Sequence, residues 1–466
     1  MNDLVEVRAG VYHDSVSLMR VSQALAALPG VSVAIVAMAT ELNVGLAREA
    51  GFAVPAATPG DLLVAIRASS EDAVREAAAE LERRLAAREA AGAARREDRP
   101  PRTTRSAARA AGAGGATVAL VSVPGEYAFL EALDAVEAGL SVMIFSDNVP
   151  VEQEILLKDR AREKGVLVMG PDCGTAVIGG AGLGFANVLR PGPVGVVAAS
   201  GTGAQQVTSL LDLAGVGVSH LLGVGGRDLS AEVGGRSAIQ ALRALDADPA
   251  TELILLVSKP PAPEAAGAVR DLGLGTELVT ALLGPGRDDL TTAVEKVLGA
   301  LGREVPVWPC WPAPSGAPGT PGSECRGPLR GLYSGGTLCA EAAVIAGSGE
   351  FTDFGDDAYT RGRAHPMIDP TLRLEALDAV ESGVVLLDVV LGHGADPDPS
   401  ARLAPAVARA CGRGVAVVVA LVGTDGDPQG LRAQAARLNE AGAAVFTSNA
   451  AAARHARDLA AARVHS

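Results

Sequence analysis

The chain has 466 residues, a hydrophobic content of 48%, an aromatic content of only 3% and a formal net charge of −14. This length predicts about three domains, and the abundance of Gly, Val, Leu and Ala predicts a multidomain α/β protein with tight strand-to-helix turns. The negative charge argues against a nucleic-acid partner and against binding to an anionic membrane surface.

Residues 1–90 are predicted to form a small α/β domain. Apolar periodicity predicts strands and helices that alternate along the chain. In order, they are 4–7, 14–28, 31–38, 41–49, 61–66 and 71–88. Residues 91–115 contain an arginine-rich run without periodicity, and we interpret them as an exposed linker.

Residues 116–192 are predicted to form a βαβαβ unit with a parallel sheet covered on both faces. Its strands are 117–123, 141–145 and 166–169, and its helices are 127–137 and 151–164. Ligands of such sheets bind outside the carboxyl ends of the strands. The strand-end loops therefore supply the candidate cofactor-binding residues, which are Pro124, Ser146, Asp147, Asn148, Gly170, Pro171 and Cys173.

Two further α/β domains are predicted at 193–304 and 329–466, separated by a Pro- and Gly-rich linker at 305–328. The first has predicted strands at 194–199, 220–224, 253–257 and 278–282, and the second has them at 331–333, 384–390, 415–421 and 444–446.

A Ser-, Gly- and Thr-containing turn follows the first strand of each of these two domains and opens a helix. The turns are Ser200-Gly201-Thr202-Gly203 and Ser334-Gly335-Gly336-Thr337. The unpaired N–H groups and the positive dipole end of such a helix bind phosphate or carboxylate groups. We therefore predict that one small anion is held between the two helix ends.

The five cysteines are scattered and form no CxxC pair, which is typical of reduced thiols in the cytoplasm. No His or acidic group has the spacing of metal ligands, so we expect no metal site. No apolar run reaches the roughly 18–20 residues that span a bilayer, and the N-terminus has no apolar signal core. The sequence predicts a cytoplasmic protein.

The motifs resemble a known superfamily. Residues 170–174 and 194–202 are similar to the Gly-Pro-Asn-Cys-Pro-Gly and Val-Gly-Ile-Val…Ser-Gly-Thr segments of the α subunit of succinyl-CoA synthetase, and 223–228 to its Gly-Ile-Gly-Gly-Asp strand end. Residues 329–466 resemble the C-terminal domain of that enzyme's β subunit. The stretches 12–19, 226–230 and 365–373 are more specific, and on them the chain is identified as a member of the FdrA family.

The resemblance implies a Rossmann-like CoA-binding-type domain followed by two flavodoxin-like succinyl-CoA-ligase-type domains. It also implies a subunit of an oxamate carbamoyltransferase in purine (allantoin) catabolism, working with partner subunits or as a homo-oligomer. Three departures stand beside it. No histidine lies between His220 and His365 to carry phosphate, no Gly-rich CoA-binding turn precedes Thr117, and no ATP-grasp domain has a counterpart. CoA is therefore possible, but no cofactor is assigned.

A site that holds a phosphate without a nucleophile to keep it suits direct transfer from a carbamoyl or acyl phosphate to a small carboxylate or amide. Ser200, His365 and Arg227 are the predicted catalytic residues. Phosphate and substrate binding is assigned to the two turns together with Gly226, Lys259, Arg363 and Asp369, and Arg361 is a further candidate cation.

Plainer interpretations stay open. The two turns can be simple tight turns, His365 and Cys173 can be structural, and Lys259 and His393 can lie on the surface. A CoA ligase with a separate nucleotide-binding partner, or a non-catalytic scaffold subunit, are the alternative functions.

Overall fold

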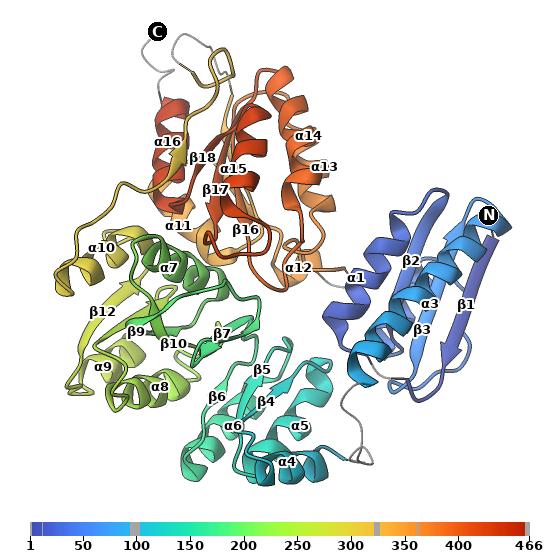
Figure 1. Ribbon diagram of the computed structural model, residues 1–466, viewed down its shortest axis with the longest axis horizontal. Coiled ribbons are helices and arrows are strands. Elements are labelled where there is room, and N and C mark those ends of the chain that lie inside the picture. The colour runs from blue at the N-terminus through green and yellow to red at the C-terminus, as the bar shows by residue number, and fades with distance from the viewer. Residues whose placement is uncertain (1, 12, 94–102, 321–326, 361–362, 462–466) are drawn as a thin grey trace.

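The computed structural model describes residues 2–11, 13–93, 103–320, 327–360 and 363–461. The chain forms four α/β units in chain order, each built on its own sheet (Figure 1). The multidomain α/β fold predicted from the sequence is confirmed.

The N-terminal unit contains a three-stranded antiparallel sheet in the order β1-β3-β2. β3 lies in the middle and is almost entirely buried, with Leu62 and Val64 facing one hydrophobic cluster and Leu63 and Ala65 facing another. This alternation follows from the two-residue period of a strand. The elements are β1 (Asn2–Arg8), α1 (Ser15–Ala26), β2 (Val31–Met38), α2 (Glu41–Glu49), β3 (Leu62–Ala68) and α3 (Glu71–Ala93).

The segment predicted to be a linker contains a helix, α4 (Thr104–Ala113), so the prediction is wrong there. Thr103 and Ser106 form a reciprocal capping box, and Ala108 is buried against the next unit. Thr103 and Ser106 are a cap signal, and small residues are good helix formers, so both signals were present in the sequence. Residues 94–102, with most of the predicted arginine run, lie outside the described residues.

The second unit is the predicted βαβαβ unit, with a parallel sheet in the order β4-β5-β6. Its elements are β4 (Val118–Val121), α5 (Gly125–Glu137), β5 (Ser141–Ile144), α6 (Val151–Lys164) and β6 (Val168–Met169). α5 and α6 pack on the sheet through a cluster of small and branched side chains. The strand-end loops gather at the carboxyl edge, as expected for a parallel sheet.

The third unit has a six-stranded sheet in the order β12-β11-β9-β10-β7-β8. β9 to β12 are parallel, and the hairpin of β7 and β8 joins through antiparallel pairing of β7 with β10. This hairpin precedes residue 193, so the sheet extends back beyond the predicted start of the domain. The elements are β7 (Thr175–Ile178), β8 (Ala181–Gly184), β9 (Pro191–Ala198), α7 (Gly201–Leu213), β10 (Val218–Gly223), α8 (Arg236–Asp246), β11 (Leu253–Ser258), α9 (Pro263–Arg270), β12 (Glu277–Leu282) and α10 (Leu290–Ala300).

The fourth unit has a six-stranded sheet in the order β13-β18-β17-β16-β14-β15. Two of its strands depart from the sequence prediction: β13 comes from the predicted Pro- and Gly-rich linker and pairs antiparallel with β18, and β15 was not predicted. The elements are β13 (Cys310–Trp311), β14 (Leu329–Tyr333), α11 (Gly336–Ala346), β15 (Glu350–Asp353), α12 (Asp357–Thr360), α13 (Thr371–Asp378), β16 (Val384–Val390), α14 (Pro399–Gly412), β17 (Ala416–Val422), α15 (Leu431–Glu440), β18 (Ala444–Phe446) and α16 (Asn449–Ala461).

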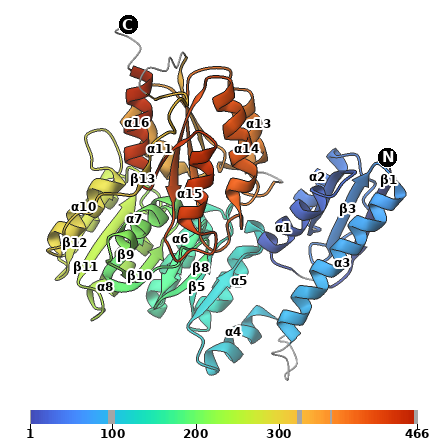
Figure 2. The ribbon, with the colours of Figure 1, turned by 45° about the horizontal axis from the view of Figure 1, so that its top comes forward.

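One hydrophobic cluster runs through both the third and the fourth unit. Val207 of α7, Val294 of α10, Leu338 of α11 and Ala453 of α16 belong to it, and all four are buried. These helices lie between the two sheets in both views (Figures 1 and 2). Because α7 and α11 pack against each other, the turns at their N-termini are held at one place.

Candidate functional site

The turns that open α7 and α11 line one cavity of about 540 Å³, as the sequence predicted. Ser200 caps α7, because its Oγ accepts a hydrogen bond of 2.9 Å from the Gly203 N–H. The same hydroxyl donates to Thr337 Oγ1 in α11 at 2.7 Å. The two helix N-termini are therefore joined directly through their side chains.

Glycine allows this close approach. A Cβ on Gly335 would lie 2.5 Å from Thr202 Oγ1, and a Cβ on Gly203 would lie 3.0 Å from Thr337 Cγ2. Side chains at these positions would push the turns apart. Gly201 differs, because a Cβ there would contact only Thr175 Oγ1, at 3.5 Å. Packing of the two turns therefore does not require glycine at this position, and its missing side chain leaves space for a ligand.

The α11 turn already holds an anion of the protein. The amides of Ser334 and Gly335 donate to the two carboxylate oxygens of Asp388 at 2.7 and 2.9 Å, and the Ser334 hydroxyl donates at 3.0 Å. Asp388 is completely buried and forms an ion pair with buried Arg373 at 3.0 Å. Within the described residues no carboxylate accepts a hydrogen bond from the amides that start α7, and these are the ones available to a ligand.

Two cations line the cavity. Lys259 follows β11, and its ammonium would lie 3.3 Å from a Cβ on Gly336, beside the start of α11. Arg363 lines both this cavity and a larger one. Within the described residues neither side chain forms an ion pair. Arg361 lies outside the described residues.

His365 also lines this cavity and is neutral at physiological pH. Burial lowers its pKa to about 4, and the charge of Arg373 contributes. Its Nδ1 accepts the Met367 N–H at 3.3 Å, so the ring hydrogen resides on Nε2. A neutral ring with this tautomer can donate a hydrogen bond from Nε2, but it cannot act there as a base.

The cavity contains carboxylates that the sequence prediction missed. Asp172, which is exposed at the cavity surface, and half-buried Asp353 line it, and desolvation by the surrounding protein raises the pKa of both groups, that of Asp172 to about 6. Asp357 lies at the junction with the larger cavity, and its pKa is raised for the same reason. Asp172 follows β6 and Asp353 ends β15. The rule that ligands bind at the carboxyl ends of parallel strands would therefore have identified Asp172 from the sequence. Identifying Asp353 depended on a strand that was not predicted.

Several predicted residues lie elsewhere. The structure does not bring Arg227 into the cavity, because its guanidinium pairs with Glu154 at 2.9 Å and donates to the Val149 carbonyl at 2.7 Å. Asp369 accepts hydrogen bonds from Thr371 and Arg402, and lines only the larger cavity.

Of the strand-end loops, Pro124, Ser146 and Asp147 line the smaller cavity together with Gly226. Asn148 lines the larger cavity, whereas Gly170 and Pro171 line neither of the two. Cys173 is buried, and burial raises its pKa to about 12, so its thiol is structural. His393 exchanges backbone hydrogen bonds with Ala186.

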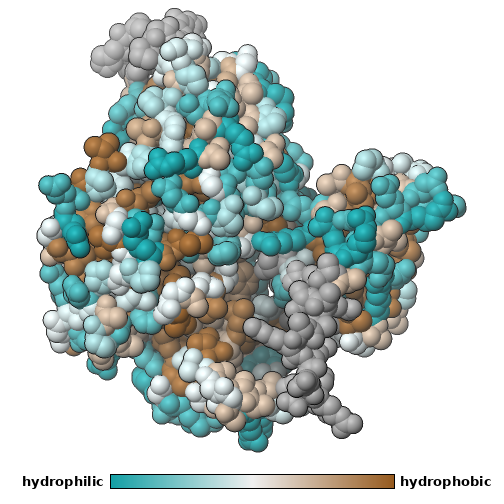
Figure 3. Space-filling model, viewed as in Figure 1, coloured by the Kyte–Doolittle hydropathy of each residue, from teal (hydrophilic) through white to brown (hydrophobic). Residues whose placement is uncertain are grey.

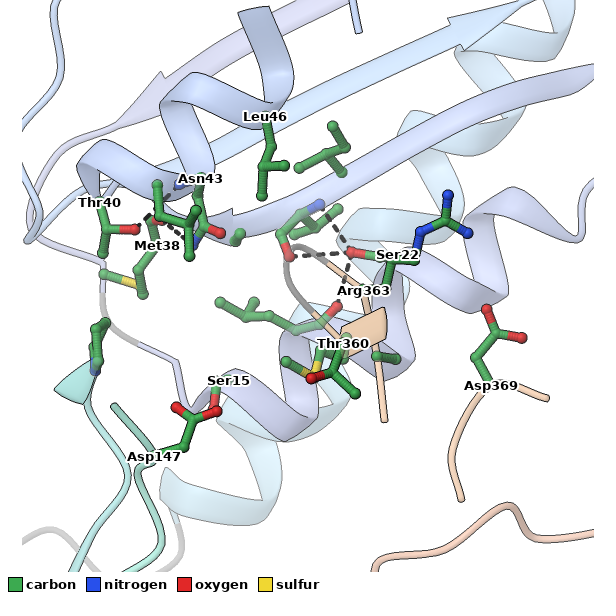
Figure 4. Close-up of a pocket in the computed structure, with 18 of the residues that line it drawn as sticks. Ser15, Ser22, Met38, Thr40, Asn43, Leu46, Asp147, Thr360, Arg363 and Asp369 are labelled. Atoms are coloured by element: carbon green, nitrogen blue, oxygen red, sulfur yellow. Dashed lines mark hydrogen bonds between the residues drawn. The ribbon is translucent and has the colours of Figure 1, made fainter. Parts of the chain in front are cut away.

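The larger cavity, of about 1010 Å³, lies between the N-terminal unit and the rest of the chain. Figure 4 shows Ser22, Met38 and Leu46 of the N-terminal unit around this cavity together with Arg363, and Ser15 beside Asp147. Ser15 and Met19 of α1 line both cavities. In the space-filling view the N-terminal unit forms a separate lobe (Figure 3).

Polar contacts from α1 attach this lobe to the last unit. Gln23 donates to the Ile368 carbonyl at 3.0 Å, and Arg20 donates to the Ala395 carbonyl at 3.3 Å. α1 is thus placed beside the segment that carries His365.

CoA fits the strand-end loops of the second unit poorly. The loops 122–126, 146–150 and 170–174 contain no Lys or Arg, and Glu126, Asp147 and Asp172 make them acidic. A Cβ on Gly125 would lie 2.1 Å from the Asp147 carbonyl oxygen, so a backbone acceptor already faces the start of α5. Phosphate groups bind where free N–H donors and positive charge surround them. No step of the reaction is therefore assigned to CoA.

Two features are absent from the described residues. No group of three or more His, Cys, Asp or Glu side chains could hold a metal ion. No helix in that part of the chain combines the length and the apolar character needed to cross a bilayer.

Comparisons with known proteins match separate parts of the chain. Residues 1–101 match the family described as "AllF, heavy metal-associated domain", and residues 332–459 match the family described as "CoA-ligase". Residues 1–101 contain no cysteine and one histidine, His13.

Among curated proteins, the uncharacterized protein YahF of Escherichia coli K12 is 35% identical over 96% of this chain and 97% of its own length. The succinate–CoA ligase [ADP-forming] subunit alpha 2 of Archaeoglobus fulgidus is 30% identical over 31% of this chain, which spans 50% of that subunit.

Among solved structures, the dinucleotide-forming acetyl-coenzyme A synthetase 1 of Ca. Korarchaeum cryptofilum is 16% identical. The match covers 74% of this chain and 83% of that one, with a TM-score of 0.30.

Proposed function

We propose a function on the premise that this chain belongs to the FdrA family, within the succinyl-CoA ligase superfamily. The protein is acyl-CoA-ligase-like. The proposed reaction is the transfer of a carbamoyl or acyl group between a phosphate and a small carboxylate or amide, as in an oxamate carbamoyltransferase of purine (allantoin) catabolism in the cytoplasm.

The single observation that carries this proposal is the cavity where α7 and α11 begin. The open amides of α7, the Thr337 hydroxyl and the Lys259 ammonium surround one space of about 540 Å³. Together they offer hydrogen-bond donors and one positive charge to a phosphate dianion. Asp388 occupies the corresponding amides of the α11 turn, so the phosphate is proposed to bind at α7.

In the carbamoyl case, the amide nitrogen of oxamate attacks the carbonyl carbon of carbamoyl phosphate. A C–N bond forms, the C–O bond to phosphate breaks, and the nitrogen loses one proton while the departing phosphate gains one. The products are N-carbamoyl oxamate and hydrogen phosphate. His365 Nε2–H and the α7 amides stabilise the charge that develops on the phosphate oxygens as the bond breaks.

Positioning supplies the remaining rate enhancement. Holding both reactants in attack geometry contributes roughly 7–11 kcal/mol at best, so a covalent intermediate is not required. This agrees with the loop 284–289, which contains no histidine to carry a phosphate.

A substitution of Lys259 tests the proposal. The assay measures phosphate release from carbamoyl phosphate and oxamate by the full chain, together with any partner subunits. Lys259→Met removes the charge in the cavity and is expected to raise the KM for carbamoyl phosphate at least about 10-fold. Lys296→Met, a surface lysine paired with Asp288, is the matched control and is expected to behave as the wild type. Equal kinetics for both variants would contradict a phosphate site at Lys259.

A second candidate is an acyl-CoA ligase that works with a nucleotide-binding partner subunit, and the CoA-ligase match of residues 332–459 favours it. Ligand-induced stabilisation separates the two candidates. Carbamoyl phosphate, but not CoA, is expected to raise the Tm of the purified chain. Incubation with radiolabelled ATP is expected to leave no acid-labile phosphate on His365 or His393, and a stable phosphohistidine would favour the ligase.

A further inference from the structure

We infer that Asp172 is the general base of the site, which takes the proton from the acceptor nitrogen and returns it to the departing phosphate. This inference rests on the proposed function and deepens it, because it requires an acceptor that must lose a proton, such as an amide nitrogen.

The position of Asp172 separates it from the carboxylates at the junction of the two cavities. It lines the smaller cavity with Ser200, Gly201 and Lys259, and it does not line the larger one. Asp147 and Asp357, in contrast, line both cavities and lie at their junction. Asp353 and Asp356 also line only the smaller cavity, but the Asp353 carboxylate accepts the Gly355 N–H and the Asp356 carboxylate accepts the Ala358 N–H.

The backbone presents this side chain to the cavity. Asp172 adopts a left-handed conformation with φ of 56°, which few residues other than glycine, asparagine and aspartate accept. Its own N–H donates to the Ser146 carbonyl at 2.9 Å, which holds the turn. A Cβ on Gly226 would lie 3.5 Å from its Oδ2, so the carboxylate reaches across to the loop after β10.

The carboxylate is free to accept a proton. Within the described residues no group donates a hydrogen bond to it. The other groups in the cavity are less suited. His365 carries its hydrogen on Nε2 and accepts the Met367 N–H at Nδ1, Asp353 accepts the Gly355 N–H, and Lys259 is a cation.

The surrounding charges tune this group. Asp172 is exposed at the cavity surface, and desolvation by the protein around it, with the neighbouring Asp147 and Asp357, raises its pKa to about 6, while Lys259 and Arg227 oppose the shift. A carboxyl group with a pKa near the operating pH can both take a proton and give it back within one turnover. The acidic cluster in a cavity proposed for an anion then has a role, because it keeps Asp172 from being a permanent anion.

The balance of the step is complete without another reactant. The acceptor N–H bond breaks as the C–N bond forms, and the proton moves to an Asp172 oxygen. As the carbamoyl C–O bond breaks, the same proton passes to the departing phosphate oxygen, and phosphate leaves as the hydrogen phosphate dianion. Asp172 ends the cycle as a carboxylate.

The test is the pH dependence of kcat/KM for carbamoyl phosphate and oxamate, with the full chain and any partner subunits. The wild type is expected to lose activity below an apparent pKa near 6. In Asp172→Asn, kcat should fall by about 10²- to 10⁴-fold and this acidic limb should vanish, while the KM for carbamoyl phosphate stays within about 3-fold. Hydroxylamine as the acceptor needs no base to attack, and with it the loss in the variant should shrink below about 10-fold.

Asp357→Asn tests the cause of the tuning. Removing this neighbouring negative charge is expected to move the acidic limb of the profile to lower pH, a change that loss of packing would not produce. A melting temperature of Asp172→Asn at pH 8 that is not below the wild-type value shows that the variant is folded.

The outcomes separate the two proposals. If the wild type transfers the carbamoyl group and Asp172→Asn keeps its rate and its pH profile, the inference about Asp172 is wrong and the proposed function stands. If the wild type transfers to neither oxamate nor hydroxylamine, the proposed function fails and the inference fails with it.

Discussion

The two turns that open α7 and α11 have nearly the same residues but different surroundings. Ser200 is half-buried, its hydroxyl caps α7, and the first amides of that helix face the cavity. Ser334 is fully buried, and its amide and hydroxyl, with the Gly335 amide, are taken by Asp388. The same local signal therefore produces one helix end open to a ligand and one whose anion is supplied by the protein.

This difference revises the expectation of one anion held equally by two helices. Asp353 adds a further carboxylate beside α11, because a Cβ on Gly336 would lie 2.3 Å from its Oδ2. α11 contributes the Thr337 hydroxyl and a rigid support for the α7 turn. The amides of α7 and the charge of Lys259 attract the phosphate.

Removal of the internal anion is expected to have the largest effect. Asp388→Ala leaves Arg373 buried without its partner and the α11 turn without an acceptor, and it should lower the free energy of unfolding by about 3–5 kcal/mol. Asp425→Ala breaks an exposed pair with Arg432 and should cost less than about 1 kcal/mol. Urea unfolding measures both. A small effect at Asp388 would mean that the α11 turn is not stabilised by its carboxylate.

The contact between the turns is tested by Gly335→Ala. Its new methyl group would lie 2.5 Å from Thr202 Oγ1, and separating the turns should cost about 1–3 kcal/mol of stability together with activity. Gly201→Ala is the control on the other turn, where the nearest atom lies 3.5 Å away. Gly201→Ala should leave the free energy of unfolding within about 1 kcal/mol of the wild-type value. It should change only the KM for carbamoyl phosphate. Unfolding curves and KM values that do not separate the two variants would contradict this view of the contact.

Ser200→Ala probes the open turn. The hydroxyl donates to Thr337 rather than to the cavity, so turnover should fall about 10-fold, at the lower end of the range for a lost donor in a preorganised site. Loss of the helix cap should cost about 1 kcal/mol of stability. Phosphate release and thermal unfolding are the two measurements. Unchanged turnover in a folded variant would remove Ser200 from the site.

Ser334→Ala is expected to have the smallest effect. It removes one buried hydrogen bond to Asp388, while the amides of Ser334 and Gly335 keep theirs, and should cost about 1 kcal/mol. Turnover should stay within about 3-fold of the wild type. A loss of turnover larger than that of Ser200→Ala would reverse the roles given to the two turns.

Much of the architecture could be predicted from local pattern. Strands such as β2, β16 and β18 and helices such as α2 and α6 have the predicted bounds, because their apolar periodicity and their end signals coincide. The two strands of the fourth unit that were not predicted share a cause. β13 and β15 have two and four residues, too few for a period to show, and they exist because a neighbouring strand offers hydrogen bonds.

The amino-acid sequence by itself determined the α/β class and the two Ser- and Gly-containing turns, since these depend on side-chain period and backbone freedom within a few residues. Only the tertiary structure decided what each turn meets. Asp388 lies 53 residues from Gly335, and Ser200 lies 137 residues from Thr337, so the partner of each helix end follows from the packing of two sheets around one core. The same packing pairs Arg227 with Glu154, outside the cavity, and places Asp172 at the cavity. Ion pairs and cavities bring together residues that are distant in the sequence, so local sequence patterns do not predict them.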